Sequence, residues 1–180
     1  MKQLLLSSIT GLSLLALSTF QPVYALNNAG TVSLTLGGGY DYFSSKRLVK
    51  NSGVGFGIAG YNFTDQWGIE ALLGFFNTKS RHTNNYDKTV NGTLFAFDAV
   101  YHFSPYASLQ PYVLAGPGVT GFNPNGTDAH NEGNINAAVG ADYFFNEIVA
   151  LRVEARDFFT FNGGKNDVLI SGGVTFLINT

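Results

Sequence analysis

Hydrophobic and polar side chains alternate along most of this chain, in segments of roughly ten residues closed by aromatics and a turn. The segment 148–159 shows the pattern most clearly, because its odd positions begin Val-x-Leu-x-Val-x-Ala. Arg152, Glu154 and Arg156 occupy the even positions between them. Successive side chains of a strand point to opposite sides of a sheet, so this spacing puts hydrocarbon on one face and charge on the other. The same alternation recurs at 32–37, 95–102 and 135–143.

Eight such segments predict eight strands, at 31–43, 53–64, 67–78, 90–103, 110–121, 133–145, 148–160 and 167–178. Long polar connections are expected at 44–52, 79–89, 122–132 and 161–166, and short ones at 65–66, 104–109 and 146–147. An even-stranded barrel with both chain ends in the periplasm has three short turns on that side and four longer loops outside. The pattern therefore predicts an all-β fold, an eight-stranded antiparallel transmembrane β-barrel. Pro111 and Pro117 count against regular pairing in the fifth segment, because proline lacks a ladder donor.

Composition indicates that the apolar face of the strands is the outer one. Only 12% of the residues are charged and 14% are aromatic, whereas a soluble domain carries about a quarter charged residues. Aromatic rings prefer the interface between membrane and water, and the sequence places one predicted belt near the short turns and one near the long loops. The first comprises Tyr61, Phe63, Trp67, Tyr101, Phe103, Tyr106, Tyr112, Tyr143 and Phe145. The second comprises Tyr40, Tyr42, Phe43, Phe75, Phe76, Phe122, Phe158, Phe159 and Phe161.

The start of the chain is typical of an export signal. Lys2 precedes an apolar stretch from Leu4 to Phe20, and Val23-Tyr24-Ala25 offers small residues for cleavage. We expect residues 1–25 to be a signal peptide and residues 26–180 to form an outer-membrane β-barrel domain, exported through the periplasm. The absence of cysteine excludes disulfides and thiolate metal sites. A net charge of -2 gives no nucleic-acid footprint.

Several segments resemble the OmpA-like family of small outer-membrane β-barrels of Gram-negative bacteria, namely 99–103, 110–116 and 140–145. The last strand is similar to the family's assembly signal, with Ser171, Gly173, Phe176 and Ile178 at its positions, although family members usually end in an aromatic residue. The resemblance implies recognition by the barrel assembly machinery. Longer members carry a second domain that holds peptidoglycan; only two residues follow Ile178, so we do not expect that activity here.

Six charged residues fall on the inward face, and Asp41 is a further candidate: Glu70, Asp98, Asp142, Arg152, Glu154 and Arg156. Buried charges are tolerated when they are paired and hydrogen-bonded. We therefore expect a lumenal network in which the two arginines bridge Glu154 and carboxylates of neighbouring strands. The network has two interpretations, a plug that fills the barrel or a gate in a narrow channel.

Three short motifs suggest chemistry, but their settings argue against it. His102-Phe103-Ser104 resembles the His-x-Ser pair of outer-membrane lipid A deacylases, yet the fourth strand runs toward the periplasm, away from the outer leaflet. The G-x-G-x-x-G spacing at 116–121 has no following helix to hold a phosphate. Asp128, His130 and Glu132 lie in a predicted loop that lacks a fourth donor. We expect no catalytic residue, no cofactor and no metal site.

The sequence thus favours a non-catalytic, monomeric outer-membrane barrel that serves envelope integrity or surface interaction through its loops. Its expected partners are outer-membrane lipids, the assembly machinery and surface or host ligands. A narrow ion or small-solute channel and a lipid-modifying barrel enzyme remain the alternatives.

Overall fold

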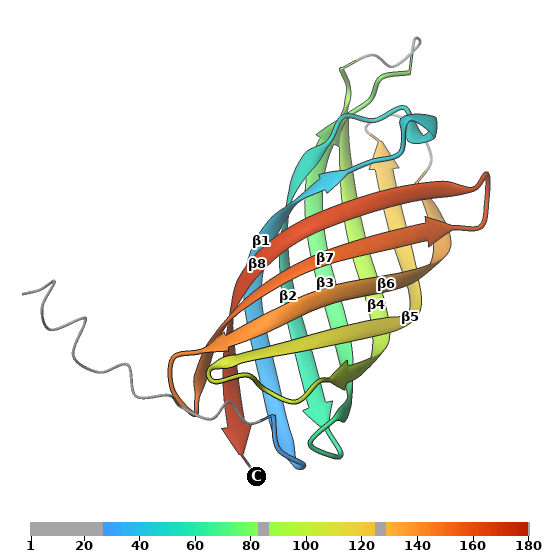
Figure 1. The fold of residues 1–180 in the computed structure, drawn as a ribbon. Coiled ribbons are helices and arrows are strands. Elements are labelled where there is room, and N and C mark those ends of the chain that lie inside the picture. The colour runs from blue at the N-terminus through green and yellow to red at the C-terminus, as the bar shows by residue number, and fades with distance from the viewer. Residues whose placement is uncertain (1–26, 83–86, 125–128, 180) are drawn as a thin grey trace, which may run out of the picture.

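The computed structural model describes residues 27–82, 87–124 and 129–179, and the predicted signal peptide lies outside these ranges. Each strand pairs antiparallel with the next, and β8 pairs with β1, so the sheet closes into a barrel (Figure 1). The predicted fold is confirmed. The strands are β1 (Thr31–Tyr42), β2 (Ser52–Asn62), β3 (Trp67–Lys79), β4 (Thr89–His102), β5 (Leu109–Pro124), β6 (His130–Phe144), β7 (Val149–Thr160) and β8 (Lys165–Asn179).

The helical content of the described residues is a single 3-10 turn, η1 (Ser45–Arg47), in the connection between β1 and β2. Within the same residues, no helix has the length and apolar character needed to cross a membrane.

Two of the four connections predicted to be long are shorter than expected. In the segment 122–132, all described residues except Ala129 are strand, because β5 and β6 stay paired as far as Phe122 and His130. The link between β7 and β8 is a tight turn in which Gly163 and Gly164 have positive φ, a backbone conformation that favours glycine. Polar composition therefore misplaced these loop boundaries. We call the end of the barrel with these four connections the loop end, and the opposite end the turn end.

The two prolines disturb the sheet at one place only. Both lie within β5, whose pairing with β6 is continuous. Pairing with β4 stops between Ala96 and Ala99, opposite Pro117, which has no N–H to donate. At the neighbouring Gly116 a Cβ atom would stand 2.0 Å from the carbonyl oxygen of Phe97, so glycine permits the close approach of the two strands.

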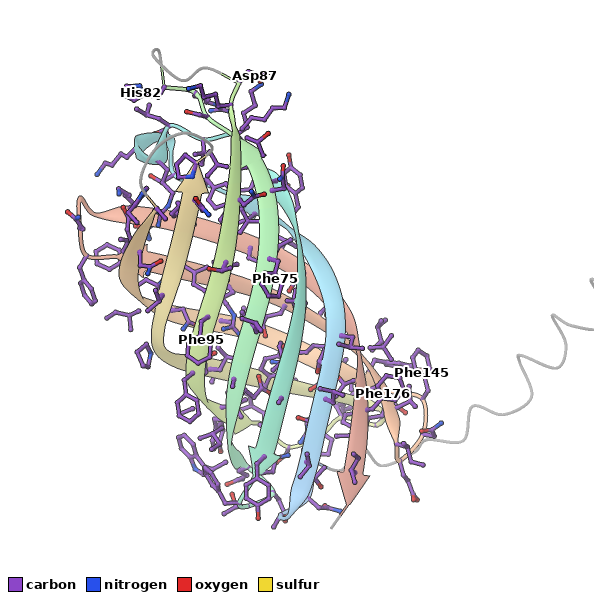
Figure 2. The ribbon with its side chains drawn as sticks, turned by 180° about the vertical axis from the view of Figure 1, so that it is seen from behind. Phe75, His82, Asp87, Phe95, Phe145 and Phe176 are labelled. Carbon is purple, nitrogen blue, oxygen red and sulfur yellow. The ribbon has the colours of Figure 1, made fainter. Side chains whose placement is uncertain are left out.

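The apolar face of the strands points outward, as predicted. Leu36, Leu73, Val139 and Val153 are exposed on the barrel wall, as are Phe75 and Phe95, whose strand neighbours Phe76 and Leu94 are buried; Figure 2 shows the outward Phe75 and Phe95. Most of the predicted belt aromatics also face outward, among them Tyr40, Tyr42, Phe75, Phe159 and Phe161 at the loop end and Tyr61, Phe63, Trp67, Phe103 and Phe145 at the turn end.

Five of the predicted belt aromatics are inside the barrel instead, and that part of the prediction is wrong. They are Phe43, Phe76, Phe122, Phe158 and Tyr112. Side chains two apart in a strand share a face, so Phe76 follows buried Leu72 into the lumen. The distance from the nearest loop gives the correct height of these rings along the barrel. Whether a ring points into the lumen or outward depends on whether its position shares a face with the inward or the outward residues of its strand.

Candidate functional site

Two arginines of β7 hold together a network of charges in the lumen, on the turn-end side of its middle. The Arg152 guanidinium forms a two-pronged pair with Glu70, each nitrogen 2.8 Å from a carboxylate oxygen, and also contacts Glu154 at 2.8 Å. Arg156 lies on the same face beyond Glu154 and pairs with Glu154 and Asp98, both at 2.7 Å. Five of the six predicted lumenal charges therefore meet, and they join β3, β4 and β7 across the barrel.

Neutral groups of β5 and β6 complete this network. The Tyr112 hydroxyl donates to Glu154 at 2.7 Å, and the Arg152 guanidinium lies over the Tyr112 ring, 4.2 Å from its centroid. The Asn136 amide donates to Asp98 at 2.8 Å and accepts a bond from Arg156 at 2.9 Å. We call this set the charged layer: Glu70, Asp98, Tyr112, Asn136, Arg152, Glu154 and Arg156.

The charged layer is almost completely inaccessible to water, since none of the paired side chains is more than 4% exposed. Removing charges from water is costly unless good geometry and further hydrogen bonds compensate for it. The two-pronged contact of Arg152 and the three hydrogen bonds that Glu154 accepts supply most of this compensation, while Arg152 Nε and Arg156 Nη2 have no hydrogen-bond partner among the described residues. The layer can therefore fill the lumen with charge and still be stable.

Two acids of the lumen stand apart from the charged layer. Asp142 is buried beside Arg152 on the neighbouring strand, but it makes no ion pair among the described residues, and one of its oxygens lacks a partner. Asp41 lies nearer the loop end, and neither of its oxygens has a hydrogen-bond partner in the described part of the chain. Among the described residues, the network therefore does not include Asp142, which was predicted to belong to it, or the further candidate Asp41.

An apolar cluster occupies much of the loop-end half of the lumen, beside buried polar side chains such as Asp41 and Thr120, and no sequence prediction anticipated it. We call this cluster the apolar layer; it consists of Phe43, Val49, Val54, Phe56, Ile58, Leu72, Phe76, Val90, Leu94, Ala96, Phe122, Phe158 and Leu169. The rings of Phe43, Phe76 and Phe122 pack at centroid distances of 5.1 to 6.1 Å. Parity along each strand would have indicated these residues, apart from Val49, which lies in the connection between β1 and β2.

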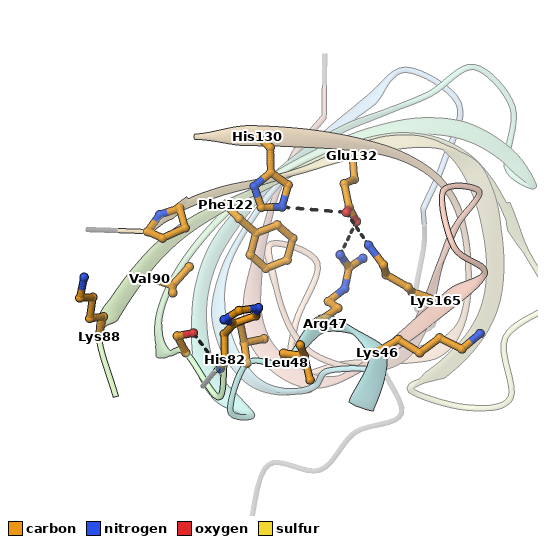
Figure 3. A pocket seen from close by; sticks show the side chains of 13 residues that line it. Lys46, Arg47, Leu48, His82, Lys88, Val90, Phe122, His130, Glu132 and Lys165 are labelled. Atoms are coloured by element: carbon orange, nitrogen blue, oxygen red, sulfur yellow. Dashed lines mark hydrogen bonds and ion pairs between the residues drawn. The ribbon is translucent and has the colours of Figure 1, made fainter. Parts of the chain in front are cut away.

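A third group closes the opening at the loop end, and its centre is Arg47 of η1 (Figure 3). Arg47 pairs with Glu132, with Asp167 at 2.5 Å and with the Thr160 hydroxyl at 2.7 Å. Lys165 pairs with Glu132 at 2.5 Å. We call these five residues the mouth cluster. No periodic pattern marks Arg47, because it lies in a loop, and the αL residue Leu48 that ends η1 has no distinctive sequence signal.

Above the mouth cluster lies a pocket of about 220 Å³. Its apolar side includes Leu48, Val90 and Phe122, and the His130 ring stacks on Phe122 at 5.5 Å (Figure 3). Arg47 and Lys165 line it too, but their charges are already taken up by carboxylates.

The three motifs have no catalytic arrangement in the described residues. His102 is buried inside the turn end, 3.3 Å from the Asn27 amide, while Ser104 is exposed in the following turn. The glycine-rich segment 116–121 lies within strand β5. Asp128 is outside the described residues, and no group of three metal-binding side chains is found within them.

The four residues of the predicted assembly signal lie on β8, which closes the barrel against β1 and β7. Phe176 and Ile178 are exposed on the outer wall, whereas Ser171 and Gly173 are half-buried on the other face. The apolar half of the pattern is thus available on the surface of the closing strand.

Comparison with known proteins gives the family. The profile of the family described as outer membrane protein beta-barrel domain matches residues 11–176. The chain is 32% identical over 114 residues to outer membrane porin F of Pseudomonas aeruginosa, an alignment that covers 61% of this chain and 33% of the porin. The chain therefore spans about a third of the length of that relative.

Two solved structures from the same organism are similar in fold. The N-terminal beta-barrel domain of Pseudomonas aeruginosa OprF matches with a TM-score of 0.60 and 22% identity, over 84% of this chain and 100% of that one. The outer membrane protein OprG matches with a TM-score of 0.64 and 13% identity, over 88% of this chain and 100% of that one.

Proposed function

Because the chain belongs to the family of outer membrane protein β-barrel domains and lies in the bacterial outer membrane, we propose that it is a sealed, non-catalytic barrel. Its role is to support the envelope and to present its loop end for surface interactions. The observation that carries this proposal is the blocked lumen, in which the charged layer, the apolar layer and the mouth cluster follow one another along the barrel.

A channel would require all three of these groups to move. Ions meeting the apolar layer would have to give up their hydration to hydrocarbon, and the arginines and carboxylates of the charged layer are already paired with one another. Eight strands give an interior just wide enough for its own side chains. A structural barrel is therefore favoured over the narrow channel.

The loop end carries a basic surface suited to such interactions. Lys46, Lys50, Lys79, Arg81 and Lys88 extend from the first two long connections. The two connections are held together by backbone bonds, from the Lys50 N–H to the Lys79 carbonyl at 2.9 Å and from the Arg81 N–H to the Leu48 carbonyl at 2.5 Å.

One acid, Asp87, stands among these basic residues. Hydrogen bonds from Lys50 and then Lys79 hold the pKa of its carboxyl below the ordinary value. The acid therefore stays charged at neutral pH, and the surface keeps an excess of four positive charges among these six residues. We infer that the loop end, turned to the outside, contacts anionic groups there.

A deletion strain tests the proposal when complemented with either the wild-type chain or a triple variant, Lys79→Gln with Arg81→Gln and Lys88→Gln. The wild type should restore resistance to a large antibiotic and adsorption to an anionic surface. The triple variant should restore only the resistance. Altered lipid A on expression of the wild type would contradict the non-catalytic part of the proposal.

The assembly signal and the monomeric state are parts of the same proposal. The exposed Phe176 and Ile178 are well placed for recognition of the unfolded or nascent β8 by the assembly machinery. Replacing both with serine should lower the amount of folded barrel in the outer membrane, and crosslinking in native membranes should give a single-chain species.

A further inference from the structure

The outer wall carries a groove of mixed polar and apolar lining near the loop end, on strands β3 to β6. Its volume is about 380 Å³. Three asparagines, Asn91, Asn123 and Asn131, are among its lining residues, together with Phe75, which lies on the outer side of β3 (Figure 2). We call it the Asn groove and define it by Phe75, Asn91, Thr93, Gly121, Asn123 and Asn131. The residues that line it include no Lys, Arg, Asp or Glu.

Strand register brings these side chains together in two rows. In the lower row Phe75, Thr93, Gly121 and Asn131 are successive partners across β3, β4, β5 and β6. In the upper row Asn91 pairs with Asn77 on one side and Asn123 on the other. The Asn77 amide donates to the Asn91 side-chain oxygen at 2.7 Å, a bond in which the amide hydrogens of Asn91 take no part.

Gly121 forms the floor of the Asn groove. A Cβ atom at this position would stand 2.7 Å from the Thr93 hydroxyl oxygen and 2.9 Å from the side-chain oxygen of Asn131. The missing side chain therefore lets a hydroxyl and a carboxamide face the same hollow, one from each side.

The height of the groove matches the upper edge of the hydrocarbon. Asn91 is ten residues from Tyr101, a turn-end belt residue on the same strand. With ~3.4 Å per residue and a tilt of ~40°, that distance corresponds to about 25 Å along the barrel axis, the height of the apolar band of such barrels. Directly below the lower row, Phe95 and Val119 are strand partners and both are exposed.

We propose that the Asn groove binds the sugar ring of an outer-leaflet glycolipid whose acyl chains lie along Phe95 and Val119. Carboxamides and a hydroxyl both donate to and accept from sugar hydroxyls. The exposed ring of Phe75 offers an apolar face to the sugar. A site that continues downward along the hydrocarbon region suits a ligand with acyl chains better than a soluble glycan. A lining without charged side chains does not select for a phosphate group. The membrane is therefore the source of the ligand.

The test is a titration of the full folded chain in zwitterionic micelles, followed by backbone amide NMR, with purified lipopolysaccharide as the probe. The amides of Thr93, Gly121 and Asn131 should shift and saturate. Gly121→Leu fills the groove and should weaken the apparent affinity by about tenfold, as expected from losing one or two hydrogen bonds. The double variant Asn91→Ala with Asn131→Ala keeps Gly121 and should weaken the apparent affinity to a similar extent. It tests the proposal if the leucine variant does not fold.

Asn166→Ala is the matched control. Asn166 is an outward asparagine near the same end of the barrel, bonded to Asp157, but it lies on β8, away from the strands that form the groove. It should bind lipopolysaccharide like the wild type. Equal affinity in all variants would overturn the proposal. So would equal shifts with phosphatidylglycerol, which carries no sugar ring, or saturation at the same concentration by the delipidated oligosaccharide.

Discussion

The two halves of the lumen are closed by opposite chemistry. Near the turn end, Arg152 and Arg156 join carboxylates on three strands through pairs of 2.7 to 2.8 Å. Near the loop end, thirteen apolar side chains pack against one another without a charge among them. Both layers fill the same narrow lumen, so a small barrel can be closed by paired charges or by apolar side chains.

The two halves of the lumen contribute to the fold in different ways. Ion pairs have directions and defined partners, so the charged layer links particular strands and disfavours a shifted register. The apolar layer depends on volume and tolerates exchange between side chains of similar size. The two halves should therefore respond differently to substitution, with charge removal severe in one and volume loss severe in the other.

The largest effect is expected from Arg152→Leu. It leaves Glu70 without its two-pronged partner and removes one contact to Glu154, and breaking a buried pair in this way costs about 3–5 kcal/mol. Urea unfolding in lipid vesicles measures the change. Adding Glu70→Leu should recover part of the loss. A single variant within about 1 kcal/mol of the wild type would show that the pairing does not matter.

Truncation in the apolar layer should come next. Leu72 is 1% exposed, and Leu72→Ala should lower the free energy of unfolding by about 2–4 kcal/mol through lost burial and a cavity. Leu72→Met keeps the volume and should cost under about 1.5 kcal/mol. If the two variants were equally unstable in the same vesicles, packing would not be what holds this half together.

The mouth cluster should give a smaller effect. Arg47→Gln leaves Glu132 with Lys165 and deprives Asp167 of its cation, and we expect a loss of about 1–3 kcal/mol. Amide exchange of η1 should accelerate more than that of the strands. Lys46→Gln on the same turn, whose ammonium contacts only the carbonyls of the β7–β8 turn among the described residues, is the control. Uniform acceleration across the barrel would contradict a local closure.

The smallest effect is expected from Asp142→Asn. One Asp142 oxygen has no hydrogen-bond partner, so the buried charge contributes little, and the variant should be unchanged or more stable by up to ~1 kcal/mol. Glu154→Gln, within the charged layer, is the matched comparison and should destabilise. Equal losses in the two variants would place Asp142 inside the network after all.

The period of the sequence predicts most of this architecture, because alternate positions of a strand must face opposite sides. It leads directly to the inward placement of Arg152, Glu154 and Arg156, and their pairing follows from the cost of burying charge. The apolar layer was missed because Phe76 and Phe122 were assigned by their distance from loops and not by parity. Arg47 could not have been found, since its contacts arise from the path of a loop. The Asn groove depends on cross-strand register, which alternation alone does not determine.

The proposed function depends most on the lumen being closed. Single-channel recording of the folded wild-type chain in planar bilayers tests this directly, with Arg152→Leu combined with Leu72→Ala as the variant that weakens both layers. We predict no stepwise current for the wild type and intermittent steps for the double variant. Steady, reproducible steps from the wild-type barrel would contradict the account.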